Sequence, residues 1–277
     1  MQNRSFIGNL KKGISKRIRG LFHNPYAKTG LSWMKIKQLK HLPSGQPRQQ
    51  DFFGKILHFI DPPELLHGIK EIFVEEIYKQ TLPPTAYIID CGANIGLSVI
   101  YMKQLYPDAK IIAFEPDAKN FALLEKNVSS FQCKNVSLRK EAVWIADTEL
   151  YFATAGSMSS KIEQEATSST TIVKATRLKN LLTEPVDFLK IDIEGAEYAV
   201  LEDIRENLHN VKNLFIEYHG SFAQNNELTS IFNWIQQQGF SYYIKEAAPI
   251  YPTPFQRNDR VGFDYDVQLN IFCFRKN

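Results

Sequence analysis

The run from Tyr87 to Gly96 constrains the fold of this chain more than any other feature. A short apolar stretch, typical of a buried strand, leads into a loop of the form Asp90-x-Gly92-x-Asn94-x-Gly96, and a second apolar stretch ends at Glu115. A strand, a glycine loop, a helix and a second strand that ends in an acid form the unit by which open parallel sheets hold an adenosine-bearing cofactor. We therefore expect such a cofactor here.

The loop also indicates which cofactor binds. Dinucleotide folds favour Gly-x-Gly-x-x-Gly, in which bare backbone lets a pyrophosphate reach the helix N-terminus. Here the middle glycine is absent and Asn94 stands in the loop. S-adenosylmethionine has an amino-acid tail instead, and its ammonium and carboxylate suit Asp90 together with backbone N–H groups. Glu115 would then accept hydrogen bonds from both ribose hydroxyls. NAD, or a simple strand-to-helix turn with no cofactor, are the alternatives.

Length and composition fit a single large α/β domain or a core with an appendage, since the chain has 277 residues of which 44% are hydrophobic. The sequence contains no run of 18 apolar residues and no signal-peptide pattern at its N-terminus, which predicts a cytoplasmic protein. Three widely spaced cysteines, Cys91, Cys133 and Cys273, are expected to be free thiols in a reducing compartment.

Charge is distributed unevenly along the chain. Residues 1–50 hold 11 Lys or Arg and no acid, which leaves 22 basic and 30 acidic residues in the remainder. Within residues 4–22 apolar side chains recur at helical spacing and basic side chains take the other faces. Such a basic amphipathic helix could contact an anionic membrane surface or another polyanion, or it could pack on the rest of the chain.

Three segments are expected. Residues 1–50 form the basic extension and a linker over 41–50, residues 51–84 form a strand and helix lead-in, and residues 85–277 form the cofactor-binding domain. In the lead-in, Lys55–Phe59 is a predicted strand, and a helix capped by Asp61 is predicted to run to about residue 80.

From Tyr87 onward, strands and helices alternate, which is typical of a wound parallel sheet with helices on both faces. Seven strands are predicted, near residues 87–91, 110–115, 136–143, 187–193, 212–218, 240–245 and 267–274. The last two are close enough in sequence to pair as a hairpin, so the sheet should contain one antiparallel strand near the C-terminus. Thr148 to Thr176 contains two further strand-like runs around Ser/Thr-rich stretches and could be a lid or a surface hairpin.

A second group of residues with ionisable side chains lies at the end of the predicted strand at 187–193 and directly after it. Asp192, Glu194 and Glu197 surround its end, and ligands of open α/β sheets bind at the carboxyl ends of strands, so Asp192 and Glu194 should face the same crevice as Gly92 and Asn94. Glu194 and Glu197 could instead simply complement the dipole of the helix that follows.

The next strand ends with Glu217 and His219. Methyl transfer from a sulfonium to an alcohol requires alignment and removal of the alcohol's proton, for which Asp192, Glu194, Glu217 and His219 are the catalytic candidates. A carboxylate or imidazole could accept the proton directly. Alternatively, a divalent cation on Asp192, Glu217 and His219 could assist.

Residues 50–277 resemble the FkbM family of S-adenosylmethionine-dependent methyltransferases. The resemblance is carried by Asp90–Gly96, Ala113–Pro116, Glu141–Val143 and Phe188–Glu197. It implies a class I methyltransferase (Rossmann-like) fold and O-methylation of a hydroxyl, commonly on sugars of surface polysaccharides or glycolipids, or on polyketide products. The basic extension lies outside the resemblance.

The resemblance also implies roles for single residues. Those that would hold the cofactor are Asp90, Gly92, Asn94, Gly96 and Glu115. Ala142 would lie beside the adenine, and Asp192 with Glu194 would face the reacting centre.

Rival functions are a glycosyltransferase, because Asp192-Ile193-Glu194 imitates an Asp-x-Asp element, and a non-catalytic scaffold with a methyltransferase-like fold. A nucleic-acid substrate is not expected, because the sequence lacks the Asn/Asp-Pro-Pro-aromatic motif of base methylation. The acceptor could stack on aromatic side chains near the last hairpin, although such residues are more often part of a core. These are Tyr242, Tyr243, Tyr251, Phe255 and Tyr265.

Overall fold

The computed structural model of the chain describes residues 24–153, 161–163, 170–257 and 265–275. The chain divides into two compact units, Met1–Ile77 and Tyr78–Asn277. The amphipathic helix expected over residues 4–22 lies outside the described residues, and so do most of the Ser/Thr-rich stretches between residues 154 and 169. No helix in the described part of the chain is long and apolar enough to cross a membrane.

The described part of the first unit consists of short helices and one β-hairpin. Its elements are η1 (Ala27–Thr29), α2 (Trp33–Lys40), β1 (Arg48–Phe52), β2 (Lys55–Phe59), α3 (Pro62–Gly68) and the π-helical η2 (Ile69–Val74). The expected strand at 55–59 and the Asp61 cap are confirmed, since the Asp61 carboxylate accepts a hydrogen bond from the Glu64 N–H at 3.0 Å.

Two expectations for this unit were wrong in their bounds. The helix ends at Val74 rather than near residue 80, because Glu76 has a φ of 53°, which no right-handed helix accommodates. The linker is shorter than residues 41–50, because Arg48 already pairs with Phe59 in the hairpin. That pairing buries Phe52, whose ring meets the Phe73 ring edge-on at 4.9 Å.

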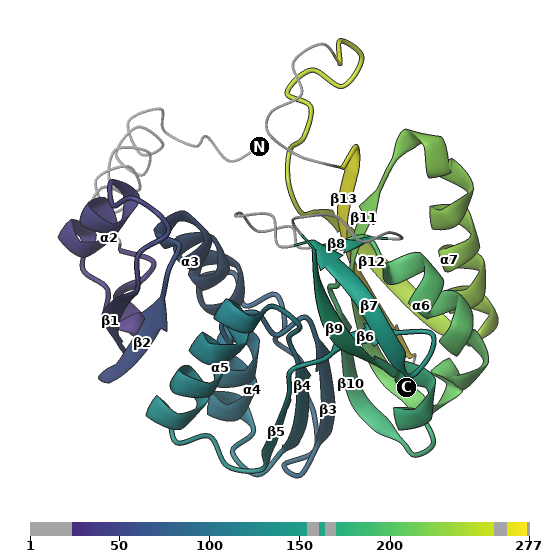
Figure 1. Cartoon of the computed structure of the whole chain (residues 1–277), viewed down its shortest axis with the longest axis horizontal. Coiled ribbons are helices and arrows are strands. Elements are labelled where there is room, and N and C mark those ends of the chain that lie inside the picture. Colours follow the sequence, from purple (N-terminus) through teal and green to yellow (C-terminus); the bar gives the residue numbers. More distant parts are fainter. Residues whose placement is uncertain (1–23, 154–160, 164–169, 258–264, 276–277) are drawn as a thin grey trace, which may run out of the picture. The chain divides into compact units, whose positions relative to one another are not determined.

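The second unit is built on a seven-stranded sheet in the order β12-β13-β11-β10-β3-β4-β5 (Figure 1). Its strands are β3 (Tyr87–Cys91), β4 (Lys110–Phe114), β5 (Val136–Arg139), β10 (Val186–Ile191), β11 (Val211–Gly220), β12 (Phe240–Glu246) and β13 (Val267–Arg275). Neighbouring strands are parallel except for β13, which runs antiparallel to both β11 and β12. The mostly parallel α/β sheet with one antiparallel strand is therefore confirmed.

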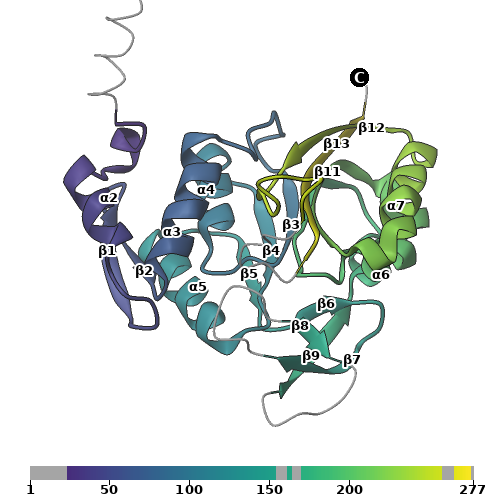
Figure 2. The ribbon, with the colours of Figure 1, turned by 90° about the horizontal axis from the view of Figure 1, so that it is seen from above.

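Helices cover both faces of this sheet (Figures 1 and 2). On one side lie α4 (Leu97–Leu105) and α5 (Ala118–Ser130), and on the other α6 (Glu197–Ile204) and α7 (Asn225–Gln237). Three short 3-10 helices, η3 (Leu178–Leu181), η4 (Arg205–Asn210) and η5 (Phe222–Gln224), connect the elements. Because both faces are covered, β10 is largely buried, and four of its residues, Val186, Phe188, Leu189 and Ile191, are apolar. Cys91 and Cys273 are buried in this core, and all three cysteines are free.

The strand expected at 136–143 is two strands in two sheets. After β5 the chain leaves the main sheet, and β6 (Ala142–Trp144) joins β7 (Thr148–Ala153), β8 (Lys161–Glu163) and β9 (Thr170–Arg177) in the order β6-β9-β7-β8. The separation follows from β6 pairing in parallel with β9, with Ala142 opposite Ala175. The segment expected to be a lid or a hairpin thus contributes most of a second, smaller sheet.

Candidate functional site

The glycine loop after β3 approaches the loop after β10 at backbone level. Gly92 has a φ of +87°, and a Cβ placed on it would lie 1.8 Å from the carbonyl oxygen of Asp192. Any side chain at this position would therefore displace one loop from the other. The structure thus brings together, at the carboxyl ends of β3 and β10, two loops that are 100 residues apart in sequence, as the sequence predicted.

Two further residues of the glycine loop also have positive φ, Asn94 at 48° and Gly96 at 92°. Asn94 tolerates this conformation better than most residues with a side chain. These three positive φ values give the compact turn from which α4 begins directly after Gly96.

Glu115 follows β4 and holds the same loop. Its Oε2 accepts a hydrogen bond from the Asn94 N–H at 2.9 Å, and its Oε1 accepts one from the Asp117 N–H at 2.9 Å. The carboxyl group is buried, and burial raises its pKa to about 8, although both N–H donors oppose the shift. The structure therefore brings the glycine loop into direct contact with the acid that follows the second strand.

Asp90 is buried at the end of β3, and its neighbour across the sheet is a lysine. Lys190 Nζ lies 3.4 Å from Asp90 Oδ1 and 3.0 Å from Asp192 Oδ2, and it donates a hydrogen bond to the Gly92 carbonyl at 2.7 Å. The other oxygen of Asp90 accepts a hydrogen bond from the Ser98 hydroxyl on α4. Burial alone would lower the pKa of Lys190, but the charges of Asp192 and Asp90 outweigh it and hold this pKa well above its usual value.

Lys190 was missed by sequence reasoning. It stands in the buried strand 186–191 between Leu189 and Ile191, and a charge in such a strand requires an opposite charge beside it. That rule could have identified Lys190 as a residue that needs a charged partner, but it could not have identified Asp90 as that partner.

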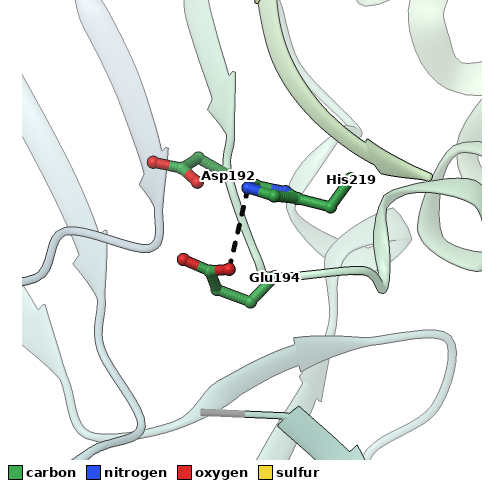
Figure 3. A group of neighbouring side chains, drawn as sticks. All are labelled: Asp192, Glu194 and His219. Carbon is green, nitrogen blue, oxygen red and sulfur yellow. Dashed lines mark ion pairs between the residues drawn. The ribbon is translucent and has the colours of Figure 1, made fainter. Parts of the chain in front are cut away.

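The carboxyl ends of β10 and β11 gather the other predicted residues, as Figure 3 shows for three of them. His219 Nε2 lies 3.6 Å from Glu194 Oε2 and 3.7 Å from Glu217 Oε1. One ligand atom from each of Asp192, Glu194 and His219 lies within 4.8 Å of the other two. The four catalytic candidates therefore form one cluster.

Glu197 is part of this cluster, which sequence reasoning did not resolve. Its carboxylate is fully buried, accepts hydrogen bonds from the N–H groups of Ile193 and Gly195, and lies 3.1 Å from His219 Nδ1. It sits at the start of α6, as the helix-dipole interpretation expected, but it also fixes the loop after β10 and the orientation of the imidazole.

The pKa values of the ionisable side chains in the cluster depend strongly on one another. Burial alone would lower the pKa of His219, but the charge of Glu197 and its hydrogen bond, with help from Glu194 and Asp192, raise it to about 10. Burial, together with the charges of Asp192, Glu197 and Glu217, raises the pKa of Glu194 to about 8, although His219 opposes the shift. At neutral pH the imidazole therefore carries a proton among several acids.

Tyr265 and Gln268 complete the surroundings of His219. The Tyr265 ring lies 4.9 Å from the imidazole, and its hydroxyl donates a hydrogen bond to the Glu194 carbonyl at 2.7 Å. Gln268 Nε2 lies 2.7 Å from Glu217 Oε1 and 3.1 Å from His219 Nε2. Both residues come from the C-terminal hairpin, which therefore closes one side of the cluster.

The other aromatic candidates separate into two groups. Tyr242 stacks on Phe232 of α7 at 4.8 Å and Tyr243 lies 6.2 Å from Phe272, while both tyrosines remain exposed. Tyr251 instead stacks on Phe222, which directly follows the loop after β11, at 5.8 Å.

The two remaining candidates are Phe255 and Ala142. Phe255 is exposed. Ala142 is buried at the start of β6, and its described strand partner is Ala175 rather than a residue of the glycine loop.

Residues 90–242, more than half of the chain, match the model of the Methyltransferase FkbM domain. The chain is 28% identical over 213 residues to Methyltransferase 1 of Beauveria bassiana, covering 66% of this chain and 82% of that protein. It is 30% identical over 187 residues to Methyltransferase sdnD of Sordaria araneosa, covering 53% of this chain and 72% of that protein.

Among solved structures, a Methyltransferase FkbM from Methylobacillus flagellatus is similar with a TM-score of 0.48 and 15% identity. The match covers 74% of this chain and 47% of that one, so this chain spans about half of that protein. M. jannaschii TYW2, solved in complex with AdoMet, is similar with a TM-score of 0.46 and 10% identity over 85% of this chain and 89% of that one.

Proposed function

The chain belongs to the FkbM methyltransferase family, and we propose that it transfers the methyl group of S-adenosylmethionine to a hydroxyl group of a sugar in a polysaccharide, glycolipid or related natural product. The observation that carries this proposal is the contact between the two loops. The glycine loop that would hold the cofactor meets the loop of the acid cluster at Gly92 and Asp192. A methyl donor on the first loop would therefore lie beside groups that can activate a hydroxyl on the second.

For the cofactor, we assign the ribose to Glu115. Its two oxygens already accept one backbone N–H each, and every carboxylate oxygen can accept a second hydrogen bond. The methionine tail is assigned to the loop of Gly92, Asn94 and Gly96. Asp90 supports this loop through Ser98 and Lys190, so we expect its effect on the tail to be mainly electrostatic. Ala142 remains the residue assigned to the adenine.

The chemical step is an in-line displacement. The acceptor oxygen attacks the methyl carbon of the sulfonium, the O–C bond forms as the C–S bond breaks, and S-adenosylhomocysteine leaves as a neutral thioether. The hydroxyl proton must pass to a base, and the protein supplies alignment and this proton acceptor.

We assign the proton to a carboxylate of the cluster rather than to His219. With a pKa raised to about 10, the imidazole already carries a proton near neutral pH and cannot accept another. Asp192 and Glu217 are the carboxylates assigned this role, whereas Glu194, whose pKa is raised to about 8, would accept the proton only above that pH. His219 would instead offset their negative charge. A divalent cation at the same residues would lower the pKa of the hydroxyl.

For the acceptor, the surface formed by Phe222, Tyr251 and Arg257 is suited to a sugar ring. The Asp266 carboxylate accepts hydrogen bonds from the Tyr251 hydroxyl at 2.6 Å and from the Phe222 N–H at 3.0 Å, which holds the two stacked rings in place. The Arg257 guanidinium lies 5.2 Å from the Phe222 ring. Tyr265, next to Asp266 in sequence, contacts His219, so this surface adjoins the cluster.

The proposal is tested with S-adenosylmethionine labelled in its methyl group. Purified protein is incubated with a panel of oligosaccharides, glycolipids and hydroxylated polyketides, and labelled products are isolated and hydrolysed. We expect label on a sugar oxygen, with transfer lost in Glu115→Gln and retained in Glu125→Gln, which changes an exposed acid of α5. Label on nitrogen or carbon would contradict O-methylation. Cofactor binding without transfer to any acceptor would favour the non-catalytic scaffold.

We further propose that the enzyme works in the cytoplasm and that residues 4–22 bind the inner, anionic surface of a membrane. The support is the excess of 11 basic residues over no acids within residues 1–50. Sedimentation with vesicles that contain about a third phosphatidylserine tests this part. Binding that is lost on replacing Lys11, Lys12 and Lys16 with Gln supports it, and equal binding to neutral vesicles opposes it.

A further inference from the structure

Three side chains at the carboxyl ends of β10 and β11 converge on one point (Figure 3). Asp192 and Glu194 come from the loop after β10, and His219 comes from the end of β11. One carboxylate oxygen from each acid and one ring nitrogen of the histidine lie within 4.8 Å of one another. An imidazole with two carboxylates is a common donor set for divalent cations.

The orientation of the imidazole fits this use. Glu197 lies 3.1 Å from His219 Nδ1, is fully buried and is itself held by backbone N–H groups. Metal-binding histidines characteristically pair the nitrogen that does not bind the metal with a carboxylate, which fixes the ring and makes it a stronger ligand. Here that arrangement leaves Nε2 directed at Glu194.

Charge in the cluster also favours a cation. Asp192, Glu194, Glu197 and Glu217 surround the single imidazole, and Lys190 is shared between Asp192 and Asp90. The carboxylates therefore outnumber the positive groups around them. A divalent ion bound at Nε2 would offset this excess.

Glu217 is the acid that the geometry leaves outside the ligand set. Its Oε1 lies 3.7 Å from His219 Nε2 and is bonded to the Gln268 amide. The same amide nitrogen lies 3.1 Å from Nε2, so Gln268 is the group that a cation on Nε2 would displace. Glu217 would then remain available to accept the proton of the acceptor hydroxyl.

We propose that Asp192, Glu194 and His219 bind a divalent cation, with Mn²⁺ the ion best suited to this donor set, and that Glu197 orients His219 for it. The three protein ligands leave coordination positions for the acceptor hydroxyl, whose pKa the ion would lower. This role rests on the proposed methyl transfer, whereas the ion site itself does not.

The site is tested by titrating Mn²⁺ into the full-length protein, freed of metal with a chelator, and following free Mn²⁺ by electron paramagnetic resonance. We expect one bound ion in the wild type and a loss of affinity of at least about tenfold in Asp192→Asn, Glu194→Gln and His219→Gln. Glu217→Gln should stay within about threefold of the wild type, and Glu202→Gln, a change to an exposed acid of α6, should match the wild type. Nitrogen hyperfine coupling to the bound ion should disappear in His219→Gln.

Two outcomes would overturn the site: no Mn²⁺ binding by the folded wild type, or a loss in Glu217→Gln as large as in Glu194→Gln. Melting temperatures and binding of S-adenosylhomocysteine, measured on each variant, separate a lost ligand from a lost fold. If the wild type binds Mn²⁺ but not S-adenosylhomocysteine, the methyl-transfer proposal fails while the ion site stands. If it binds S-adenosylhomocysteine but no metal, the ion-site proposal fails while the methyl-transfer proposal stands.

Discussion

Lys190 Nζ lies 3.4 Å from Asp90 Oδ1, and each of these side chains is only 4% exposed. The pair joins the two central strands, β10 and β3, directly below the loops that carry the proposed cofactor and reaction sites. Because Lys190 also bonds the Gly92 carbonyl and Asp192, one buried charge sets the positions of both loops.

We expect Lys190→Met to destabilise the protein strongly. Removing one partner leaves the Asp90 carboxylate buried without a compensating charge, which costs about 3–5 kcal/mol of unfolding free energy. Urea denaturation measures this change, with Lys126→Met, at an exposed position of α5, expected to stay within about 0.5 kcal/mol of the wild type. The double variant with Asp90→Asn should recover part of the loss, and a Lys190→Met protein as stable as the wild type would contradict this role.

Gly92→Ala should disrupt the meeting of the two loops. The new Cβ would lie 1.8 Å from the Asp192 carbonyl oxygen. A backbone atom cannot move aside as easily as the end of a flexible side chain can. Gly239→Ala is the matched control, because its φ of +78° is similar and its nearest neighbour, at 3.4 Å, is the end of the Arg275 side chain. We expect about 1–2 kcal/mol of destabilisation in the control and clearly more in Gly92→Ala, measured by urea denaturation. Equal losses of stability in the two variants would show that the close approach of Gly92 to the Asp192 carbonyl contributes nothing specific to stability.

Affinity for S-adenosylhomocysteine should depend on pH through Glu115. The free protein holds this carboxyl with a pKa of about 8, and ribose hydroxyls favour its ionised form, so binding must release a proton below pH 8. The association constant should therefore rise from pH 6 towards pH 8 and level off above it. Calorimetry in buffers of different ionisation enthalpy measures the released proton. Glu115→Gln should bind more weakly and lose this pH dependence, and a variant that keeps it would exclude Glu115 as the titrating group.

Glu197→Gln should lower the pKa of His219. Glu197 is the strongest of the groups that raise this pKa from 6.5 to about 10, which nuclear magnetic resonance of the imidazole can follow. A histidine whose pKa is raised on folding adds stability that is complete below pH 6.5 and is lost as the pH rises to 10. The wild type should therefore lose more stability than Glu197→Gln between these pH values. Unchanged titration of His219 would contradict the pairing.

The cofactor loop and the acid cluster could be predicted from sequence because both lie where a strand ends. Asp90, Glu115, Asp192 and Glu217 each follow a short apolar run, and the rule that parallel strands present their carboxyl ends at one edge places them together. The antiparallel strand followed from a similarly local argument, the short distance between the last two strands.

What sequence reasoning missed depends on partners that are distant in the chain. Lys190 pairs with Asp90 across 100 positions, and β6 separates from β5 because Ala142 pairs with Ala175. Glu197 was read from its place at the helix start, while its contact with His219 arises only when β11 lies beside β10. In each case the local pattern permits the observed contact without specifying it.

Binding of S-adenosylhomocysteine, measured by isothermal titration calorimetry on the wild type, Glu115→Ala and Glu125→Ala, tests the cofactor site most directly. We predict one site with a micromolar dissociation constant in the wild type and in Glu125→Ala. In Glu115→Ala we predict a loss of at least about tenfold, since each hydrogen bond to a charged group contributes more than about 1.4 kcal/mol. Absence of binding by the folded wild type, or equal binding by Glu115→Ala, would contradict the assignment of the cofactor to the loop between Asp90 and Gly96.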